Sequence, residues 1–91
     1  MEISFDPVKS ALNIEKRGLS FDRAADFDFE LALFDLDERH DYGEIRVRAL
    51  GPLDQRLHVL VFVETANGIR VISLRKANKR EVNRYEKASR S

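Results

Sequence analysis

The chain has 91 residues, of which 43% are hydrophobic and 35% are charged, and its formal net charge at pH 7 is zero. This length and composition predict a single globular domain, residues 1–91, and exclude a fibrous or disordered chain. The chain contains no cysteine, which excludes disulfides, thiol catalysis and thiolate metal sites. Nothing near the start resembles a signal sequence and no apolar run is long enough to span a membrane, so we expect a cytoplasmic protein with no membrane partner.

The charges are divided unevenly along the chain. Residues 1–44 carry twelve acids and five bases, whereas residues 45–91 carry eleven bases and four acids. A polyanion could therefore meet the basic half while a basic partner meets the acidic half. Pairing of acids and bases from the two halves on the folded surface explains the division equally well.

The N-terminal residues predict a strand followed by a helix. Residues 2–5 alternate weakly, as in a short strand, and Asp6 and Pro7 are typical of the N-cap and first turn of a helix that ends at Gly18. Two stripes at helical spacing run along this helix, one with Val8, Ala11, Leu12 and Glu15 and the other with Lys9, Asn13 and Lys16. The second stripe is polar and basic, so it is more typical of a solvated face than of a ligand site.

A second, short helix and an uncertain strand follow. Ser20 can cap a helix that extends to about Phe27, and Leu19 and Phe21 would press this helix onto the core. Residues 30–36 alternate loosely and predict a strand whose start is uncertain, and residues 37–43 form a polar loop.

Residues 44–74 give the strongest pattern, that of three antiparallel strands. In residues 44–50, Ile45, Val47 and Ala49 occupy one face, and Glu44, Arg46 and Arg48 occupy the other. Residues 51–55 are typical of a turn, and residues 57–63 are apolar on both faces, which predicts a central strand. Asn67-Gly68 predicts a hairpin because both turn positions tolerate positive φ, and residues 69–74 return as the next strand.

The last segment predicts a basic helix. Asn78 and Glu81 form a capping-box pattern, so a helix should begin after Asn78 and extend to about Ala88. Its apolar stripe is thin, so we expect it to pack on the sheet or on a partner. The junction before it gathers the cations Arg75, Lys76, Lys79 and Arg80, which indicates either a phosphate site or a solvated tail.

The residue types give little support to metal or cofactor chemistry. His40 and His58 are the only imidazoles and show no HExxH pattern, and the carboxylates of residues 35–41 are more typical of a solvated loop than of a metal site. We therefore expect neither a metal nor a cofactor, and we interpret His58 as a hydrogen-bonded structural residue of the central strand. No glycine-rich phosphate loop is present, and no nucleophile elbow surrounds Ser73.

Cleavage of an RNA phosphodiester requires less machinery. Attack by the 2′-hydroxyl needs one group that removes a proton, one that donates a proton and cations that stabilise charge on the phosphate oxygens. Glu44 and Arg46 on one strand face, with His40 in the preceding loop, could supply these functions, and Arg75 would come from the far end of the sheet. Ion pairing of Arg46 with Glu44 is an equally plausible role for those two residues.

Several segments, in order, resemble the BrnT toxins of bacterial type II toxin–antitoxin systems. They are FDPVKSALNIEKRGLSF (5–21), DERHDYGEIRVRALG (37–51), the hydrophobic strand before the Asn-Gly turn, and IRVISLRKANKREVNRYE (69–86). BrnT proteins often have His where Arg17 stands and Trp near Phe5. If that His takes part in proton transfer, this chain lacks it.

The resemblance implies a RelE-like α+β fold, with a small antiparallel sheet packed by N-terminal helices and a C-terminal helix. It also implies an endoribonuclease activity that arrests growth, with or without the ribosome. The expected partners are RNA, a BrnA-like antitoxin with a ribbon-helix-helix domain, and operator DNA bound through the antitoxin complex.

Chemistry applied to these segments predicts metal-independent RNA cleavage at one site. The predicted catalytic residues are His40, Glu44, Arg46, Arg75 and Arg80. The predicted RNA-binding residues are Lys9, Lys16, Arg48, Arg70, Lys76, Lys79 and Tyr85. Two alternatives remain: a non-catalytic module that acts with an antitoxin as co-repressor on operator DNA, and a decayed toxin that has kept its fold but lost its activity.

Overall fold

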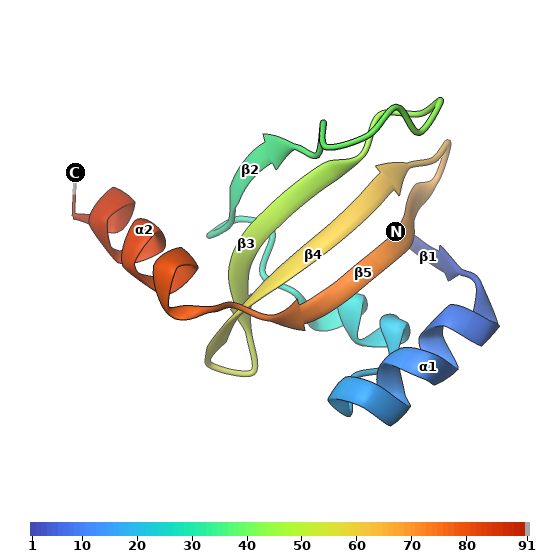
Figure 1. Cartoon of the computed structure of the whole chain (residues 1–91), viewed down its shortest axis with the longest axis horizontal. Coiled ribbons are helices and arrows are strands. Elements are labelled where there is room, and N and C mark those ends of the chain that lie inside the picture. Colours follow the sequence, from blue (N-terminus) through green and yellow to red (C-terminus); the bar gives the residue numbers. More distant parts are fainter. Residues whose placement is uncertain (91) are drawn as a thin grey trace.

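Residues 1–90 are described by a computed structural model. Their elements are β1 (Glu2–Phe5), α1 (Pro7–Arg17), the 3₁₀ helix η1 (Phe21–Asp26), β2 (Leu33–Leu36), β3 (Val47–Leu53), β4 (Arg56–Glu64), β5 (Gly68–Lys76) and α2 (Lys79–Ser89). The strands form one sheet in the order β1-β5-β4-β3-β2 (Figure 1). Within residues 1–90, no helix has the length and apolar character needed to cross a membrane.

The fold class is α+β, as predicted, and most of the sheet is antiparallel. Strands β2, β3, β4 and β5 pair antiparallel in sequence order. Strand β1, however, lies parallel to β5, with Glu2 opposite Gly68 and Phe5 opposite Val71. The expected wholly antiparallel sheet is therefore wrong at this edge, because a strand's residue pattern fixes the face that it buries but not the direction of its neighbour.

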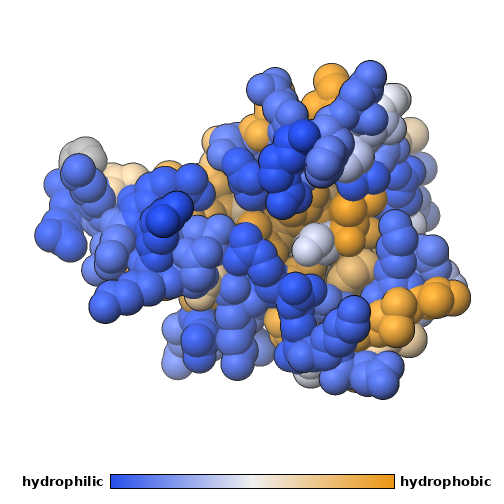
Figure 2. All heavy atoms as spheres, viewed as in Figure 1, coloured by the Kyte–Doolittle hydropathy of each residue, from blue (hydrophilic) through white to orange (hydrophobic). Residues whose placement is uncertain are grey.

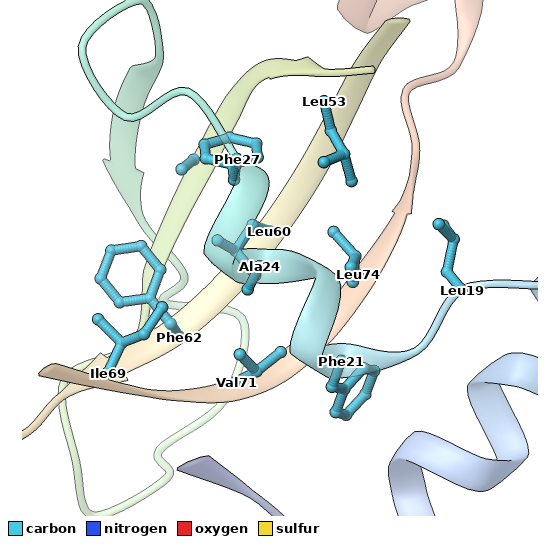
Figure 3. Close-up of a cluster of buried hydrophobic side chains, with 11 residues drawn as sticks. Leu19, Phe21, Ala24, Phe27, Leu53, Leu60, Phe62, Ile69, Val71 and Leu74 are labelled. Atoms are coloured by element: carbon cyan, nitrogen blue, oxygen red, sulfur yellow. The ribbon is translucent and has the colours of Figure 1, made fainter. Parts of the chain in front are cut away.

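The main hydrophobic core lies between η1 and one face of the sheet (Figure 3). Ala49, Leu60 and Leu74 point into it from β3, β4 and β5 and are fully buried. Leu19 and Phe21 are buried against them from the other side, as predicted. Because burial of each large apolar side chain contributes about 1.5–3 kcal/mol, this layer holds η1 on one face of the sheet.

Helix α1 begins and ends where the sequence predicts. The side chain of Asp6 accepts a hydrogen bond from the backbone N–H of Val8 (2.9 Å), and Pro7 opens the first turn. At the other end Gly18 has a φ of 70°, a left-handed conformation that glycine adopts without steric cost. Both helix ends were therefore readable from local sequence.

The buried side of α1 differs from the prediction. Asn13 belongs to the stripe that we expect to be solvated, yet it is buried, and its amide nitrogen donates to the backbone carbonyls of Leu19 and Leu74, both at 2.9 Å. Val8 and Leu12 of the other stripe are 66% and 46% exposed. The solvated interpretation is wrong for Asn13 because this helix packs through hydrogen bonds to the backbone rather than through an apolar stripe.

The turn between β3 and β4 is shorter than predicted. The chain reverses at Asp54–Gln55, where the φ angles are 51° and 66°, and Gly51 lies within β3. A Cβ atom at Gly51 would lie 2.9 Å from the Cβ of Ala32, so this glycine permits close packing rather than a turn. Strand β3 also begins at Val47 rather than at residue 44, and Ile45 is 72% exposed.

Strand β4 is central, as predicted, and its residues 59–62 are buried on both faces. His58 is buried beside them, and its Nδ1 lies 2.8 Å from the carbonyl oxygen of Arg56, in agreement with a structural role. The predicted hairpin joins β4 to β5, but neither Asn67 nor Gly68 has a positive φ. A Cβ at Gly68 would instead overlap the backbone of Glu2, so glycine allows β1 to pair here.

Helix α2 begins with the predicted capping box. The Asn78 side chain accepts from the Glu81 N–H at 2.8 Å, and the Glu81 carboxylate accepts from the Asn78 N–H at 2.9 Å. The helix buries none of its residues and extends away from the end of β5 (Figure 1). The Tyr85 hydroxyl anchors α2 to the segment before β2 by donating a hydrogen bond to the Leu31 carbonyl at 2.7 Å.

Candidate functional site

The sheet face opposite η1 combines an apolar floor with a row of arginines, and we call it the open face. Its residues are Arg48 and Leu50 on β3, Val59 and Val61 on β4, and Arg70, Ser73 and Arg75 on β5, with Arg46 directly before β3. The register places Arg48 opposite Val61 and Val61 opposite Ser73. In the view of Figure 2, hydrophobic residues occupy a hollow and hydrophilic residues surround it.

Glu44 joins two arginines at one end of the open face. Its carboxylate accepts from Arg70 Nη2 at 2.7 Å and from Arg46 Nε at 3.1 Å. These two hydrogen bonds hold the pKa of Glu44 below its usual value, and the one from Arg70 has the larger effect. The guanidinium carbon of Arg46 also lies 3.7 Å from the centre of the Tyr42 ring, which adds a cation–π contact. Glu44 is therefore ionised at neutral pH and positions both arginines.

Arg48 is held across the sheet by the neighbouring strand. Asp35 on β2 is the direct cross-strand neighbour of Arg48. Its two carboxylate oxygens accept from Arg48 Nε at 3.0 Å and from Nη2 at 2.8 Å, a bidentate pair. This pair raises the pKa of Arg48.

Arg75 forms a second bidentate pair, with Glu81 of α2. The distances from Nη1 and Nη2 to the two carboxylate oxygens are 2.8 and 2.9 Å. The hydrogen bonds from Arg75 lower the pKa of Glu81 to about 2. One carboxylate thus caps the first turn of α2 and binds an arginine of β5, so it fixes the strand-to-helix junction.

A third bidentate pair comes from the loop before β3. Arg39 donates to both oxygens of Asp37, at 2.8 and 2.9 Å, and lowers the pKa of that carboxyl to about 2. The positive charges of Arg39 and Arg48 both oppose the rise in the pKa of Arg75. The three guanidinium groups therefore feel one another's charge, while each is balanced by its own carboxylate.

A hollow of about 380 Å³ adjoins the Glu44 end of the open face. Its lining includes His40, Tyr42, Glu44 and Arg46. The His40 and Tyr42 rings meet edge to face, with their centroids 5.7 Å apart. His40 is exposed to solvent.

The structure brings together some of the predicted site residues and separates others. His40, Glu44, Arg46, Arg48, Arg70 and Arg75 lie on the open face or at its rim. Lys79 and Arg80 occupy the first turn of α2 and are exposed, and no ion pair among residues 1–90 involves Arg80. Lys76 adjoins Arg17 and Leu19 in a hollow of about 330 Å³.

Three predicted RNA-binding residues lie elsewhere or are occupied. Lys9 and Lys16 are exposed on α1, which lies beside the β1 edge on the opposite side of the molecule from α2 (Figure 1). Tyr85 packs against the floor of the open face, and its hydroxyl is bound to Leu31. Tyr85 therefore anchors α2 in this structure.

The predicted pairing of Arg46 with Glu44 is present, whereas the sequence did not predict Arg39 or the other acids that hold the arginines. Asp35 and Asp37 bind Arg48 and Arg39, and Glu81 was read only as part of a capping box. A correct strand register from residues 33–36 to residues 47–50 would have placed Asp35 opposite Arg48, but periodicity alone does not supply this register. Three of the ion pairs join acids of the first half of the chain to bases of the second, which supports surface pairing as one reason for the charge division.

The side chains of this chain that could bind a metal are those of His, Asp and Glu. In residues 1–90, no three of them converge in an arrangement that could hold a metal ion. The chemistry that the open face itself offers is therefore that of guanidinium, carboxylate, imidazole and phenol groups.

Comparison with protein families gives one match. The model of the family described as "Ribonuclease toxin, BrnT, of type II toxin-antitoxin system" matches residues 5–81. The chain belongs to the BrnT family. The matched part of this BrnT chain contains every arginine of the open face and reaches Glu81, the partner of Arg75. Neither a curated protein nor a solved structure was found to match the chain.

Proposed function

We propose that this BrnT chain is an endoribonuclease toxin that cleaves RNA on the open face without a metal ion and thereby arrests growth. In this proposal its fold is RelE-like, it acts in the cytoplasm, and a BrnA-like ribbon-helix-helix antitoxin neutralises it and carries the complex to operator DNA. The observation that carries the proposal is the open face itself, where guanidinium groups from β3, β5 and the loop before β3 surround an apolar floor.

Arginine is suited to the phosphate chemistry that RNA cleavage needs. Attack by the 2′-hydroxyl places additional negative charge on the phosphate oxygens, and fixed guanidinium groups stabilise that charge in the transition state. Arg46 and Arg70 each bond Glu44 through one nitrogen, which leaves further N–H groups for phosphate. At the other end of the open face, an RNA phosphate would displace the Glu81 carboxylate from Arg75. We assign Arg46, which adjoins the His40 and Glu44 hollow, to the scissile phosphate, and Arg48, Arg70 and Arg75 to neighbouring phosphates of the RNA.

Two side chains are candidates for proton transfer. The lowered pKa of Glu44 keeps it ionised but makes it a weak base. His40 lines the same hollow and is exposed to solvent, and imidazole is the side chain that most often serves as a general base in enzymes. We therefore assign the proton acceptor to His40 and propose that Glu44 positions Arg46 and Arg70.

The remaining predicted residues would bind RNA beyond the scissile phosphate. Lys76, Lys79 and Arg80 continue the positive charge from Arg75 along the junction of β5 with α2. Lys9 and Lys16 would be reached only by RNA that extends around the β1 edge. Tyr85 would contact RNA through its ring, because its hydroxyl is occupied by Leu31.

The test is cleavage of cellular RNA by purified, antitoxin-free protein, with and without ribosomes. We expect Arg46→Ala to reduce the cleavage rate about 100-fold, as removal of one transition-state donor does in other enzymes. Arg75→Ala should weaken RNA binding with a smaller loss of rate, and neither variant should lose antitoxin binding. Arg56→Ala is the matched control, because Arg56 is exposed at the start of β4 and should be neutral. If both variants cleave RNA at the wild-type rate, the open face is not the active site.

One observation favours a second function. Arg39, Arg46, Arg48, Arg70 and Arg75 are all paired with carboxylates in the free chain. Such a neutralised surface also suits a non-catalytic co-repressor, or a decayed toxin, that acts only with its antitoxin. Wild-type protein that leaves RNA intact and does not slow growth, yet is required for repression at operator DNA, would establish the co-repressor.

A further inference from the structure

Strand β2 forms an exposed edge of the sheet. It is the last strand in the order β1-β5-β4-β3-β2, so one of its sides has no strand partner within residues 1–90. Its sequence, LFDL, contains neither proline nor lysine, the residues that commonly protect an edge strand from pairing. The single charged side chain, Asp35, is directed to Arg48 on the neighbouring strand. Helix α2 approaches the start of β2, where Tyr85 binds the Leu31 carbonyl and Arg84 lines a hollow with residues 33–35. The rest of the free edge can accept another strand.

Apolar side chains are exposed along this edge. Leu31, Phe34, Leu36 and Ile45 are 58%, 52%, 50% and 72% exposed. Leu36 and Ile45 also line a hollow of about 440 Å³ together with Val47 and Val63, which is large enough for an apolar side chain of a partner. Apolar groups gathered at one place on a surface commonly mark an interaction site.

The chain segments that contain and flank β2 are rich in acids, although Arg48 and Arg84 also lie beside the strand. Between residues 28 and 45 there are seven acids and one base, Arg39. Asp35, Asp37 and Glu44 are engaged by arginines. Glu30, Glu38 and Asp41 are exposed, and within residues 1–90 they take part in no ion pair. This surface would repel RNA and attract a basic segment.

We propose that the free edge of β2 is the docking site for an extended segment of the antitoxin in which apolar and basic residues alternate. This inference rests on the proposed function, because a toxin–antitoxin pair supplies a protein partner. The segment adds a strand beside β2 through backbone hydrogen bonds. One set of its side chains covers Phe34 and Leu36, and its cations approach the exposed acids.

A second copy of this chain is a poorer occupant of the edge. Pairing of β2 with β2 of another copy would bring two acidic surfaces of the same composition together, and like charges repel across an interface. An RNA strand is disfavoured for the same reason. Charge thus selects a basic protein segment.

The experiment uses the full chain and the antitoxin encoded by the reading frame adjacent to its gene. Binding is measured by isothermal titration calorimetry, and amide hydrogen exchange is compared in the free toxin and the complex. We expect protection of the β2 amides on binding. We also expect at least tenfold weaker binding by Phe34→Glu and by Glu38→Lys, which remove the apolar contact and the charge attraction, respectively.

Matched controls separate docking from folding. Leu12→Glu changes an apolar residue of α1 that is 46% exposed, close to the 52% of Phe34, and should alter binding less than twofold. Glu38 is exposed, so Glu38→Lys guards against a folding defect in Phe34→Glu. RNA cleavage by free Phe34→Glu protein should equal that of wild type. Since cleavage and binding are measured separately, loss of the proposed function and loss of this docking site give different results.

Two results would overturn the docking site. One is a failure of the binding data, which means either that both Phe34→Glu and Glu38→Lys bind the antitoxin with wild-type affinity or that amide protection on binding is confined to α1 or α2. The other is a wild-type dimer, by analytical ultracentrifugation, that Phe34→Glu converts to a monomer with unchanged antitoxin affinity. The second result would assign the edge to another copy of the chain.

Discussion

The Arg75–Glu81 pair should make the stability of this protein depend on acid pH. Glu81→Gln removes the charge of the carboxylate but keeps a side-chain oxygen that can still cap the Asn78 N–H. The variant therefore isolates the ion pair from the capping box. We expect it to unfold more easily than wild type at pH 7.

The magnitude follows from the pKa of Glu81. The pKa is lowered from 4.5 to about 2, mainly by the hydrogen bonds from Arg75 and in smaller part by the Asn78 N–H and the charge of Arg84. Each tenfold change in proton affinity is worth about 1.4 kcal/mol, so about 3 kcal/mol is an upper bound on the ion pair. The side chains of Arg75 and Glu81 are 33% and 15% exposed, so solvent screens part of this energy. We expect a loss of about 1–2 kcal/mol in the free energy of unfolding.

The direction in which stability changes with pH is fixed, because the pKa of Glu81 is lower in the folded state than in the unfolded state. The pair stabilises fully above pH 4.5, and its contribution is lost as the pH falls through about 2. Urea unfolding of wild type and Glu81→Gln should therefore differ at pH 7 and converge near pH 2. Glu86→Gln is the control, because Glu86 meets Arg90 only at 3.8 Å and is 56% exposed. Equal stabilities at pH 7, or a difference that persists undiminished at pH 2, would refute the reasoning.

Three further substitutions test other parts of the structure. Asn13→Leu should destabilise by about 2–3 kcal/mol in urea unfolding, because two backbone carbonyls lose their donor in a buried site; an unchanged midpoint would show that the helix does not depend on these bonds. Leu60→Ala should cost about 2–5 kcal/mol in the same assay, because its side chain is fully buried at the centre of the sheet, and a loss below about 1 kcal/mol would contradict the core assignment. Tyr85→Phe removes the 2.7 Å hydrogen bond to Leu31 and should speed amide exchange in α2 while the β4 amides stay protected; unchanged exchange in α2 would show that Tyr85 does not anchor it.

Local signals explain why much of the fold could be predicted. The ends of α1 and α2 are set by Asp6, Gly18 and Asn78, each of which acts within a few residues of its own position. The central strand was readable from an apolar run long enough to be covered on both faces. The predicted turn, residues 51–55, is longer than the observed turn at Asp54–Gln55 because Gly51 and Pro52 resemble turn residues. Close packing against Ala32 explains the glycine at position 51.

The candidate site was only partly predictable. Glu44, Arg46 and Arg48 alternate in sequence, which predicted a shared strand face, but β3 begins only at Val47, so Glu44 and Arg46 lie before the strand. Arg75 could be assigned to the end of another strand. Their carboxylate partners could not be assigned with equal certainty, since Asp35 reaches Arg48 only through the pairing of β2 with β3. Arg80 was predicted at the same site as Arg75 because the two are close in sequence. The residue of α2 that contacts Arg75 is Glu81.

The sequence by itself determined the helix ends, the central strand, the basic junction and the family resemblance, because each depends on neighbouring residues or on motifs in order. The tertiary structure alone decided that β1 lies parallel to β5, that Asn13 is buried, and that each open-face arginine is held by a carboxylate. These features depend on strand register and on contacts between residues far apart in the chain. Periodicity specifies which face a residue occupies, but not which residue will lie opposite it.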